Sequence, residues 1–341
     1  MDIAQVLAVS IATALGPIAA TYALAAIGLN MHFGYTGLLN FGQVGFMLVG
    51  AYGVGIGVGT FGWPLWAGFL AGVGCAIVLA LLMGIPTLRL RADYLAIATI
   101  AIAEVLRMIY RAPFSRDLTG GVYGRQNLSG GWQDLNPIPS GRYGPGDLPL
   151  LEFVPVLNRI TFTHTNLWVM VLGWGMVAIA SVIMWMLVHS PWGRVIKGIR
   201  EDEEAVRSLG KNVFGYKLQS LVIGGVLGAL AGCLMAVNQA AITPDQFWPQ
   251  ITFYVWAMLL LGGAGRTWGP IVGPVVLWFF LALTDGVVRG LDSMGMLPFI
   301  SGGDQLGAVR HSVVGLVLVL LIIYRPQGLL GDRREMLINV K

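Results

Sequence analysis

Uncharged hydrogen-bonding side chains gather in a stretch that glycine interrupts, residues 29–46. Tyr35, Asn40 and Gln43 lie there among four glycines, which disfavour a regular helix. Backbone that is not helical is tolerated at membrane depth only where it is buried in protein or lines an aqueous cavity. The stretch is therefore interpreted as a broken or re-entrant segment beside a substrate path, where uncharged amides would suit a zwitterionic solute. The alternative interpretation is an ordinary turn just outside the bilayer.

An acidic side chain, Glu104, lies inside the apolar stretch 93–111. An acid within a membrane span is a functional candidate by default. Arg107 follows one turn later, however, and can pair with it on the same helix face. Both a structural ion pair and a residue of the substrate path remain open.

A third interruption lies at 259–274, where several glycines, Arg266 and Pro270 break a long apolar region. It is either a hinge or a tight cytoplasmic turn that carries one arginine.

The polar segment 190–217 contains the pattern of a short helix between two apolar runs. Asp202 can cap its N-terminus, Glu204 places negative charge in the first turn, and Gly210 can end it in a left-handed conformation. A small apolar face is predicted for Ala205, Val206 and Leu209. Two spans can be joined by a much shorter turn, so the helix is interpreted as a docking element for another protein.

No pattern of residues predicts catalysis. Lys211 follows Gly210 but lacks the earlier glycine of a phosphate loop, and the four histidines are scattered without metal-ligand spacing. Cys75 and Cys233 each fall inside an apolar run, as buried packing residues do. The chain is expected to be no enzyme and to bind no metal or cofactor itself.

Composition places these residues in a membrane. The 341 residues are 56% hydrophobic and 11% charged, whereas soluble domains carry about 25% charged residues. The net charge of +4 is spread over loops, so it predicts no nucleic-acid surface. Helical runs of ~20 apolar residues cross a bilayer, and the N-terminus lacks the basic region of a cleavable signal, so the first run is expected to remain. Nine apolar segments are predicted, at 3–28, 43–60, 65–85, 93–111, 166–189, 218–240, 251–264, 269–288 and 310–324.

The fold class predicted is an all-α polytopic membrane protein of eight to ten transmembrane helices with broken or re-entrant segments, forming a single domain over 1–341. Glycines at four-residue spacing predict close helix packing. The rows are Gly55 and Gly59; Gly224, Gly228 and Gly232; and Gly265, Gly269 and Gly273.

Orientation follows from lysine and arginine, which are enriched on the cytoplasmic side. The turn 86–92, the loop 190–217 and the tail 325–341 carry two, six and four basic residues, twelve of the 21 in the chain. They are predicted to be cytoplasmic. The N-terminus and the loop 112–165 are then predicted to lie outside.

Five stretches resemble the LivM-type permeases of branched-chain amino acid ABC importers, and the resemblance covers nearly the whole chain. The loop helix is also similar to the EAA pattern of such permeases at Glu204, Ala205 and Gly210, with Val206 in place of the second alanine. The five stretches are GLNMHFGYTGLLNFGQVGFMLVGAY (28–52), RLRADYLAIATIAIAEVLR (89–107), LTGGVYG (118–124), IREDEEAVRSLGKNVFGYKL (199–218) and LLLGGAGRTWGPIVGP (259–274).

The resemblance implies an ABC importer permease in a bacterial plasma (inner) membrane that works with other subunits. These are a second homologous permease, two cytoplasmic ATPases that hold ATP and Mg, and an extracytoplasmic substrate-binding protein. Branched-chain amino acids are the implied cargo, and urea or short amides are the alternative. The candidate substrate path comprises Tyr35, Asn40, Gln43, Glu104 and Thr119; the candidate coupling surface comprises Asp202, Glu204, Ala205, Val206, Leu209 and Gly210.

An ion-coupled secondary transporter is the rival from another class. Such a protein is expected to show paired intramembrane acids or two interrupted helices in an internal repeat. Glu104 instead has a basic neighbour, so the sequence favours the ATP-driven class.

Overall fold

A computed structural model describes residues 2–128, 135–145, 156, 159–294, 303–325 and 327–331. Parts of the predicted outer loop 112–165 and most of the predicted tail 325–341 lie outside the described residues.

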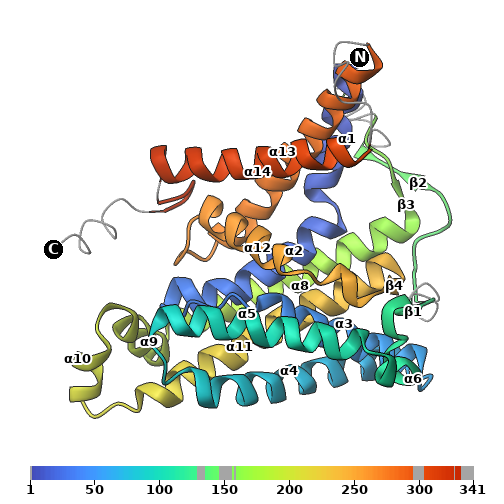
Figure 1. Cartoon of the computed structure of the whole chain (residues 1–341). Helices are drawn as coiled ribbons and strands as arrows, with labels where there is room; N and C mark the ends of the chain where they lie inside the picture. Colours follow the sequence, from blue (N-terminus) through green and yellow to red (C-terminus); the bar gives the residue numbers. More distant parts are fainter. Residues whose placement is uncertain are drawn as a thin grey trace.

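Helices dominate the described chain, and two pairs of two-residue strands join its loops (Figure 1). Strand β1 (Arg125–Gln126) pairs antiparallel with β4 (Ala241–Ile242), and β2 (Arg142–Tyr143) pairs with β3 (Phe162–Thr163). Short 3₁₀ turns lie at Pro113–Ser115, Gly121–Tyr123 and Pro244–Gln246. The α-helices are α1 (Ile3–Leu15), α2 (Pro17–Asn30), α3 (Gln43–Gly59), α4 (Leu65–Thr87), α5 (Ala92–Arg111), α6 (Arg116–Thr119), α8 (His164–His189), α9 (Pro191–Glu201), α10 (Glu203–Ser208), α11 (Val213–Gln239), α12 (Pro249–Gly262), α13 (Gly269–Ser293) and α14 (Gly303–Tyr324).

Four helices of the described residues are long and apolar enough to cross a membrane: α4, α8, α11 and most of α13. The pair α1–α2 makes a fifth candidate, although it bends by 42°. The sequence predicted one apolar segment at 3–28, and the structure divides it into two helices, because Gly16 adopts an extended conformation and Pro17 begins a new helix. The nine predicted segments include α3 and α12, which at 17 and 14 residues are shorter than a full span.

The core forms where α2, α3 and α11 cross. A Cβ atom on Gly28 would lie 2.4 Å from the carbonyl oxygen of Gly224, and one on Gly232 would lie 1.9 Å from that of Met47. These backbones can approach so closely only because the side chains are absent, as the row on α11 predicted.

The row of Gly55 and Gly59 serves a different purpose. It faces Ile242, Arg125 and Leu128 in the loops, so its glycines make room for loop side chains where the sequence predicted helix packing.

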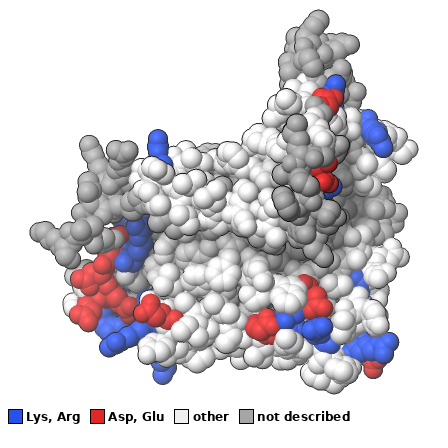
Figure 2. All heavy atoms as spheres, turned by 45° about the horizontal axis from the view of Figure 1, so that its top comes forward, with Lys and Arg blue, Asp and Glu red and all other residues white. Residues whose placement is uncertain are grey.

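Segments that the sequence predicts on the same side of the membrane lie at the same end of the structure. The turn between α4 and α5 lies beside α9 and α10 at one end of the bundle, and α6, β1 and β4 lie at the other (Figure 1). Figure 2 shows charged side chains gathered near the ends with an uncharged surface between them, as a protein surrounded by hydrocarbon requires.

Candidate functional site

The break after α2 is buried in the protein. The helix continues as one π-helical segment, Met31–Tyr35, and residues 36–42 are irregular before α3 begins. Side chains from two other helices, α5 and α12, bond to backbone groups in the break and at the start of α3. The Phe41 N–H donates to Thr99 Oγ1 at 3.0 Å, and the Val44 N–H donates to Thr252 Oγ1 at 3.0 Å. The segment is therefore a broken helix inside the bundle, as one of the two interpretations predicted, and not a turn outside it.

A buried polar junction, formed by His32, Asn40 and Gln43, fills the space at this break. His32 Nε2 lies 3.1 Å from the carbonyl oxygen of Leu221, which can only accept, so Nε2 carries the proton. Asn40 Nδ2 donates to His32 Nδ1 at 3.0 Å, while Asn40 Oδ1 accepts from the Gly42 N–H at 2.8 Å. One neutral imidazole thus donates on one side and accepts on the other.

Gln43 closes the junction at the first residue of α3. Its Nε2 donates to the carbonyl oxygens of Ala25 at 3.3 Å and Gly224 at 3.4 Å, and its Oε1 accepts from Asn40 at 3.3 Å. A Cβ atom on Gly224 would lie 2.3 Å from His32 Nε2, and one on Gly228 would lie 2.6 Å from Gln43 Nε2. The glycine row of α11 therefore makes room for polar side chains as well as for neighbouring backbone.

The predicted path residues of this region are enclosed. Tyr35, Asn40 and Gln43 are all at most 2% exposed, so in this conformation their polar groups serve the protein's own contacts. Their place on a substrate path stays a prediction. His32 was missed by the sequence analysis, because nothing in the spacing of the four histidines distinguishes it from the others.

Glu104 lies elsewhere, in an ion cluster with Arg107. The guanidinium donates to Glu104 from Nε at 2.9 Å and from Nη2 at 2.5 Å, and Nη1 donates to Asp245 Oδ1 at 2.8 Å. Arg107 is only 2% exposed and also lies 4.6 Å from the ring centre of Trp248. The cluster ties α5 to the loop between α11 and α12. The pairing of Glu104 with Arg107 was a predicted alternative; Asp245, 138 residues away, was not foreseen.

Thr119 organises the turn after α6. Its hydroxyl donates to the Tyr110 carbonyl oxygen at 2.8 Å and accepts from the Gly121 N–H at 3.1 Å, and its side chain is buried. The structure therefore distributes the five predicted path residues over three places: the buried polar junction region, the ion cluster and this turn.

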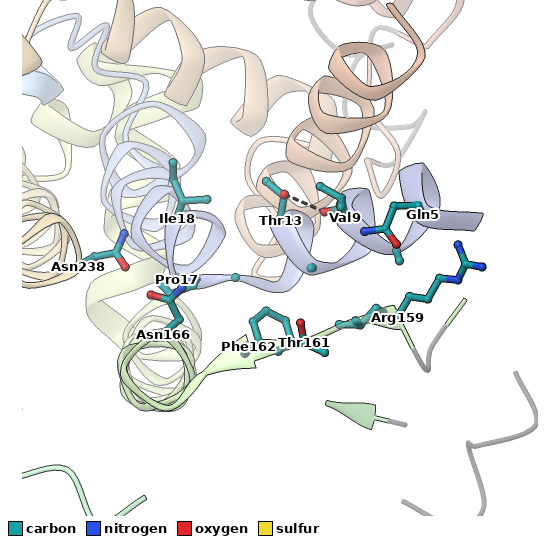
Figure 3. A pocket seen from close by; sticks show the side chains of 14 residues that line it. Gln5, Val9, Thr13, Pro17, Ile18, Arg159, Thr161, Phe162, Asn166 and Asn238 are labelled. Atoms are coloured by element: carbon teal, nitrogen blue, oxygen red, sulfur yellow. Dashed lines mark hydrogen bonds between the residues drawn. The ribbon is translucent and has the colours of Figure 1, made fainter. Parts of the chain in front are cut away.

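A hollow, here called the α1–α2 hollow, opens at the break between these two helices (Figure 3). Its polar lining residues, which have apolar neighbours, are Gln5, Thr13, Arg159, Thr161, Asn166 and Asn238. Its volume is about 480 Å³. Arg159 forms an ion pair with Asp2, which places a paired charge at its rim. Amides, two hydroxyls and apolar surface together can accept a small amphipathic solute. The sequence analysis missed the hollow because its residues come from three distant parts of the chain.

The polar loop folds as two helices where the sequence predicted one. Ser190 caps α9, with Pro191 at its first position, and Asp202 caps α10 through bonds from the Glu204 and Ala205 N–H groups at 2.9 and 3.0 Å. Gly210 ends the turn with φ of +75°, as predicted.

The predicted apolar face of α10 is wrong in one residue. Val206 is buried against Ile199 of α9 and Val213 of α11, whereas Ala205 is exposed and Leu209 is 77% exposed. The missed helix α9 covers Val206, so a partner can reach only the other two.

The loop also contacts the break directly. Arg200 of α9 donates a hydrogen bond to the carbonyl oxygen of Gly34 in the π-helical segment. The turn after α12 packs beside this segment. There Asn30, the last residue of α2, accepts from the Gly265 N–H at 2.8 Å and donates to the Arg266 carbonyl oxygen at 3.0 Å. Arg200 therefore provides a direct contact between α9 and the break.

These features define a class: an all-α, multi-pass membrane permease whose broken helix is linked to an exposed loop helix. The family model described as the branched-chain amino acid transport system permease component matches residues 12–323. The chain belongs to this family, whose members are permease subunits of ABC transporters.

Individual relatives agree in class and differ in cargo. The high-affinity branched-chain amino acid permease LivM of Salmonella typhimurium is 30% identical over 93% of this chain and 69% of its own length. A probable LivM protein of Methanocaldococcus jannaschii is 26% identical over 92% and 91%. The nucleoside ABC transporter permease NupC of Lactococcus lactis is 26% identical over 83% and 84%. No solved structure matches significantly.

Proposed function

We propose that this chain is a permease subunit that imports branched-chain amino acids with energy from separate ATPase subunits. The observation that supports it best is the exposed, capped helix α10, which presents Ala205 and Leu209 beside a loop bonded to the broken helix. ATP and Mg belong to the ATPases in this proposal. A second homologous permease and a substrate-binding protein complete the assembly.

The proposed orientation puts α9, α10 and the turn 88–91 in the cytoplasm, with the N-terminus outside and the C-terminus inside. The basic residues of these segments support it. The binding protein would then release solute at the opposite end, where the α1–α2 hollow offers amide groups and apolar surface.

The relatives that are named as branched-chain amino acid permeases support branched-chain amino acids as the cargo. Nucleoside permeases in the same family are the reason to test this directly. Urea and short amides are further alternatives on the same scaffold.

Docking on α10 is tested by Ala205→Trp in the assembled transporter. The large side chain should hold the ATPase away and abolish uptake, while the permease still inserts normally because the loop lies outside the hydrocarbon. Ala205→Ser keeps the surface small and should retain uptake. Ala101→Trp controls for the size of the new side chain alone, because Ala101 is an exposed alanine on a different helix, α5. Full uptake by Ala205→Trp at normal membrane levels would remove α10 from the ATPase interface.

The cargo is tested by uptake into vesicles that hold the complete transporter and its binding protein. Leucine, isoleucine and valine should compete with one another, and urea, acetamide and adenosine should not. Competition by adenosine or urea alone would assign a different cargo while leaving the coupling proposal intact.

A further inference from the structure

A basic pocket lies at the end of the bundle that holds α10, between the α4–α5 turn and the start of α11. Its volume is about 590 Å³. The side chains that the inference uses are Arg89, Arg91, Glu203, Arg207, Phe214 and Lys217. Four basic groups and one acid give the lining a formal excess of three positive charges.

The acid of the pocket, Glu203, already forms two ion pairs. Glu203 pairs with Arg207 at 2.8 Å and also with Lys217. Among the described residues, Arg89 and Arg91 form no ion pair, and the Arg89 guanidinium lies 5.8 Å from the ring centre of Phe214. Two exposed arginines are thus left to attract an anion, and one of them rests on an aromatic ring.

The pocket lies at the edge of a surface suited to hydrocarbon. Helix α4 ends at Thr87 and α11 begins at Val213, so the basic groups lie just beyond both spans. Exposed apolar side chains continue from there along α4 and α5: Leu82 is 70% exposed and Ile97 is 65% exposed. A ligand that occupied the pocket could extend from the charged groups onto this apolar surface.

We infer that the pocket binds the phosphate of an anionic phospholipid, whose acyl chains lie on the apolar surface of α4 and α5. Basic pockets at the ends of membrane helices attract such headgroups. A soluble protein partner would contact the arginines equally well, but it could not use the adjoining apolar surface of the spans. Because Arg207 and Lys217 bond Glu203 of α10, the lipid also braces the proposed coupling helix against the bilayer.

The inference is tested on the assembled transporter in nanodiscs of phosphatidylcholine containing about one fifth phosphatidylglycerol. Native mass spectrometry of the released complex should find phosphatidylglycerol enriched over its share in the disc. Arg89→Gln with Arg91→Gln should reduce that enrichment by about fivefold for each arginine removed. The control Arg194→Gln with Lys197→Gln removes two exposed charges from α9, outside the pocket, and should preserve the enrichment.

Two further measurements distinguish a bound lipid from a free anion and from a protein partner. Inorganic phosphate at millimolar concentration should not displace the lipid, because it gains nothing from the apolar surface; full displacement would identify a free-anion site and overturn the lipid assignment. In lipid-free detergent the Arg89 and Arg91 variant should keep its ATPase subunits. Loss of those subunits there, or equal retention of both lipids by the unmodified protein, would overturn the inference as well. Neither result depends on which solute the transporter carries.

Discussion

In the buried polar junction the polar side chains bond to other groups of the protein, whereas on α10 two apolar residues after the N-cap face solvent. His32, Asn40 and Gln43 are at most 1% exposed, and neighbouring helices supply their partners. Ala205 and Leu209 are exposed although only a short loop separates them from buried Val213. The difference separates two uses of polar sequence in a membrane protein: inside, it fixes how helices cross; outside, it forms the surface on which we propose that another protein docks. Arg200 joins the two regions.

The largest effect is expected inside, from Gly224→Ala. The new methyl group would lie 2.3 Å from His32 Nε2 and 2.4 Å from the Gly28 carbonyl oxygen, so α2 and α11 must separate. The free energy of unfolding should fall by about 3 kcal/mol, the upper range for an overpacked core. Thermal unfolding of the purified complex measures it.

Gly74→Ala is the matched control for that experiment. Nothing lies within 4 Å of a Cβ atom at this position on α4, and alanine favours helix by about 1 kcal/mol. Its stability should be unchanged or higher. Equal stability of the two variants would show that the junction is loosely packed and would weaken the comparison.

An intermediate effect is expected at the link, from Arg200→Ala. Hydrogen bonds to charged groups contribute about 1.5–3 kcal/mol, and about 1.4 kcal/mol corresponds to a factor of ten. Uptake should therefore fall about tenfold or more while ATP hydrolysis continues, because α10 still docks. Paired measurements of uptake and phosphate release would test this uncoupling.

Lys197→Ala controls for loss of charge on α9, since Lys197 is exposed and its side chain forms no ion pair among the described residues. Unchanged uptake by Arg200→Ala would show that the bond to Gly34 transmits nothing, and the two regions would then be independent.

The smallest effect is expected outside, from Asp202→Ala. Loss of an N-cap costs about 1 kcal/mol, which loosens α10 without removing its surface. Uptake should fall by about fivefold or less, and the stability of the bundle should not change. Asp202→Asn keeps a capping oxygen and should restore uptake. A large loss of bundle stability in Asp202→Ala would contradict the separation of the two regions.

Much of the fold could be predicted because its causes are local. Seven of the nine apolar segments correspond to the helices α3, α4, α5, α8, α11, α13 and α14, and the short segment at 251–264 is the short helix α12. The first segment alone corresponds to two helices, because its apolar composition continues through Gly16 and Pro17 while the helix is interrupted there. Proline after glycine was the available signal for that break.

The candidate sites were less predictable because their residues meet across the chain. Glu104 and Arg107 are three positions apart, so their pairing could be anticipated; Asp245 and Trp248 join them only because α5 packs beside the loop before α12. His32 gains its role from Leu221 and Asn40, and no spacing within the sequence links those three.

The loop helix shows where the two kinds of information divide. The sequence by itself determined that a capped helix begins after Asp202 and ends at Gly210, because caps act through neighbours in the chain. It also determined that the protein is a bundle of membrane helices, since hydrophobic length is a property of each segment alone. Only the tertiary structure decided that Val206 faces inward while Leu209 faces outward, because α9 folds back over one side of α10. Burial on α10 depends on the angle at which α9 and α11 pack against it, and that angle is set by the tertiary structure even though both helices are neighbours in the chain.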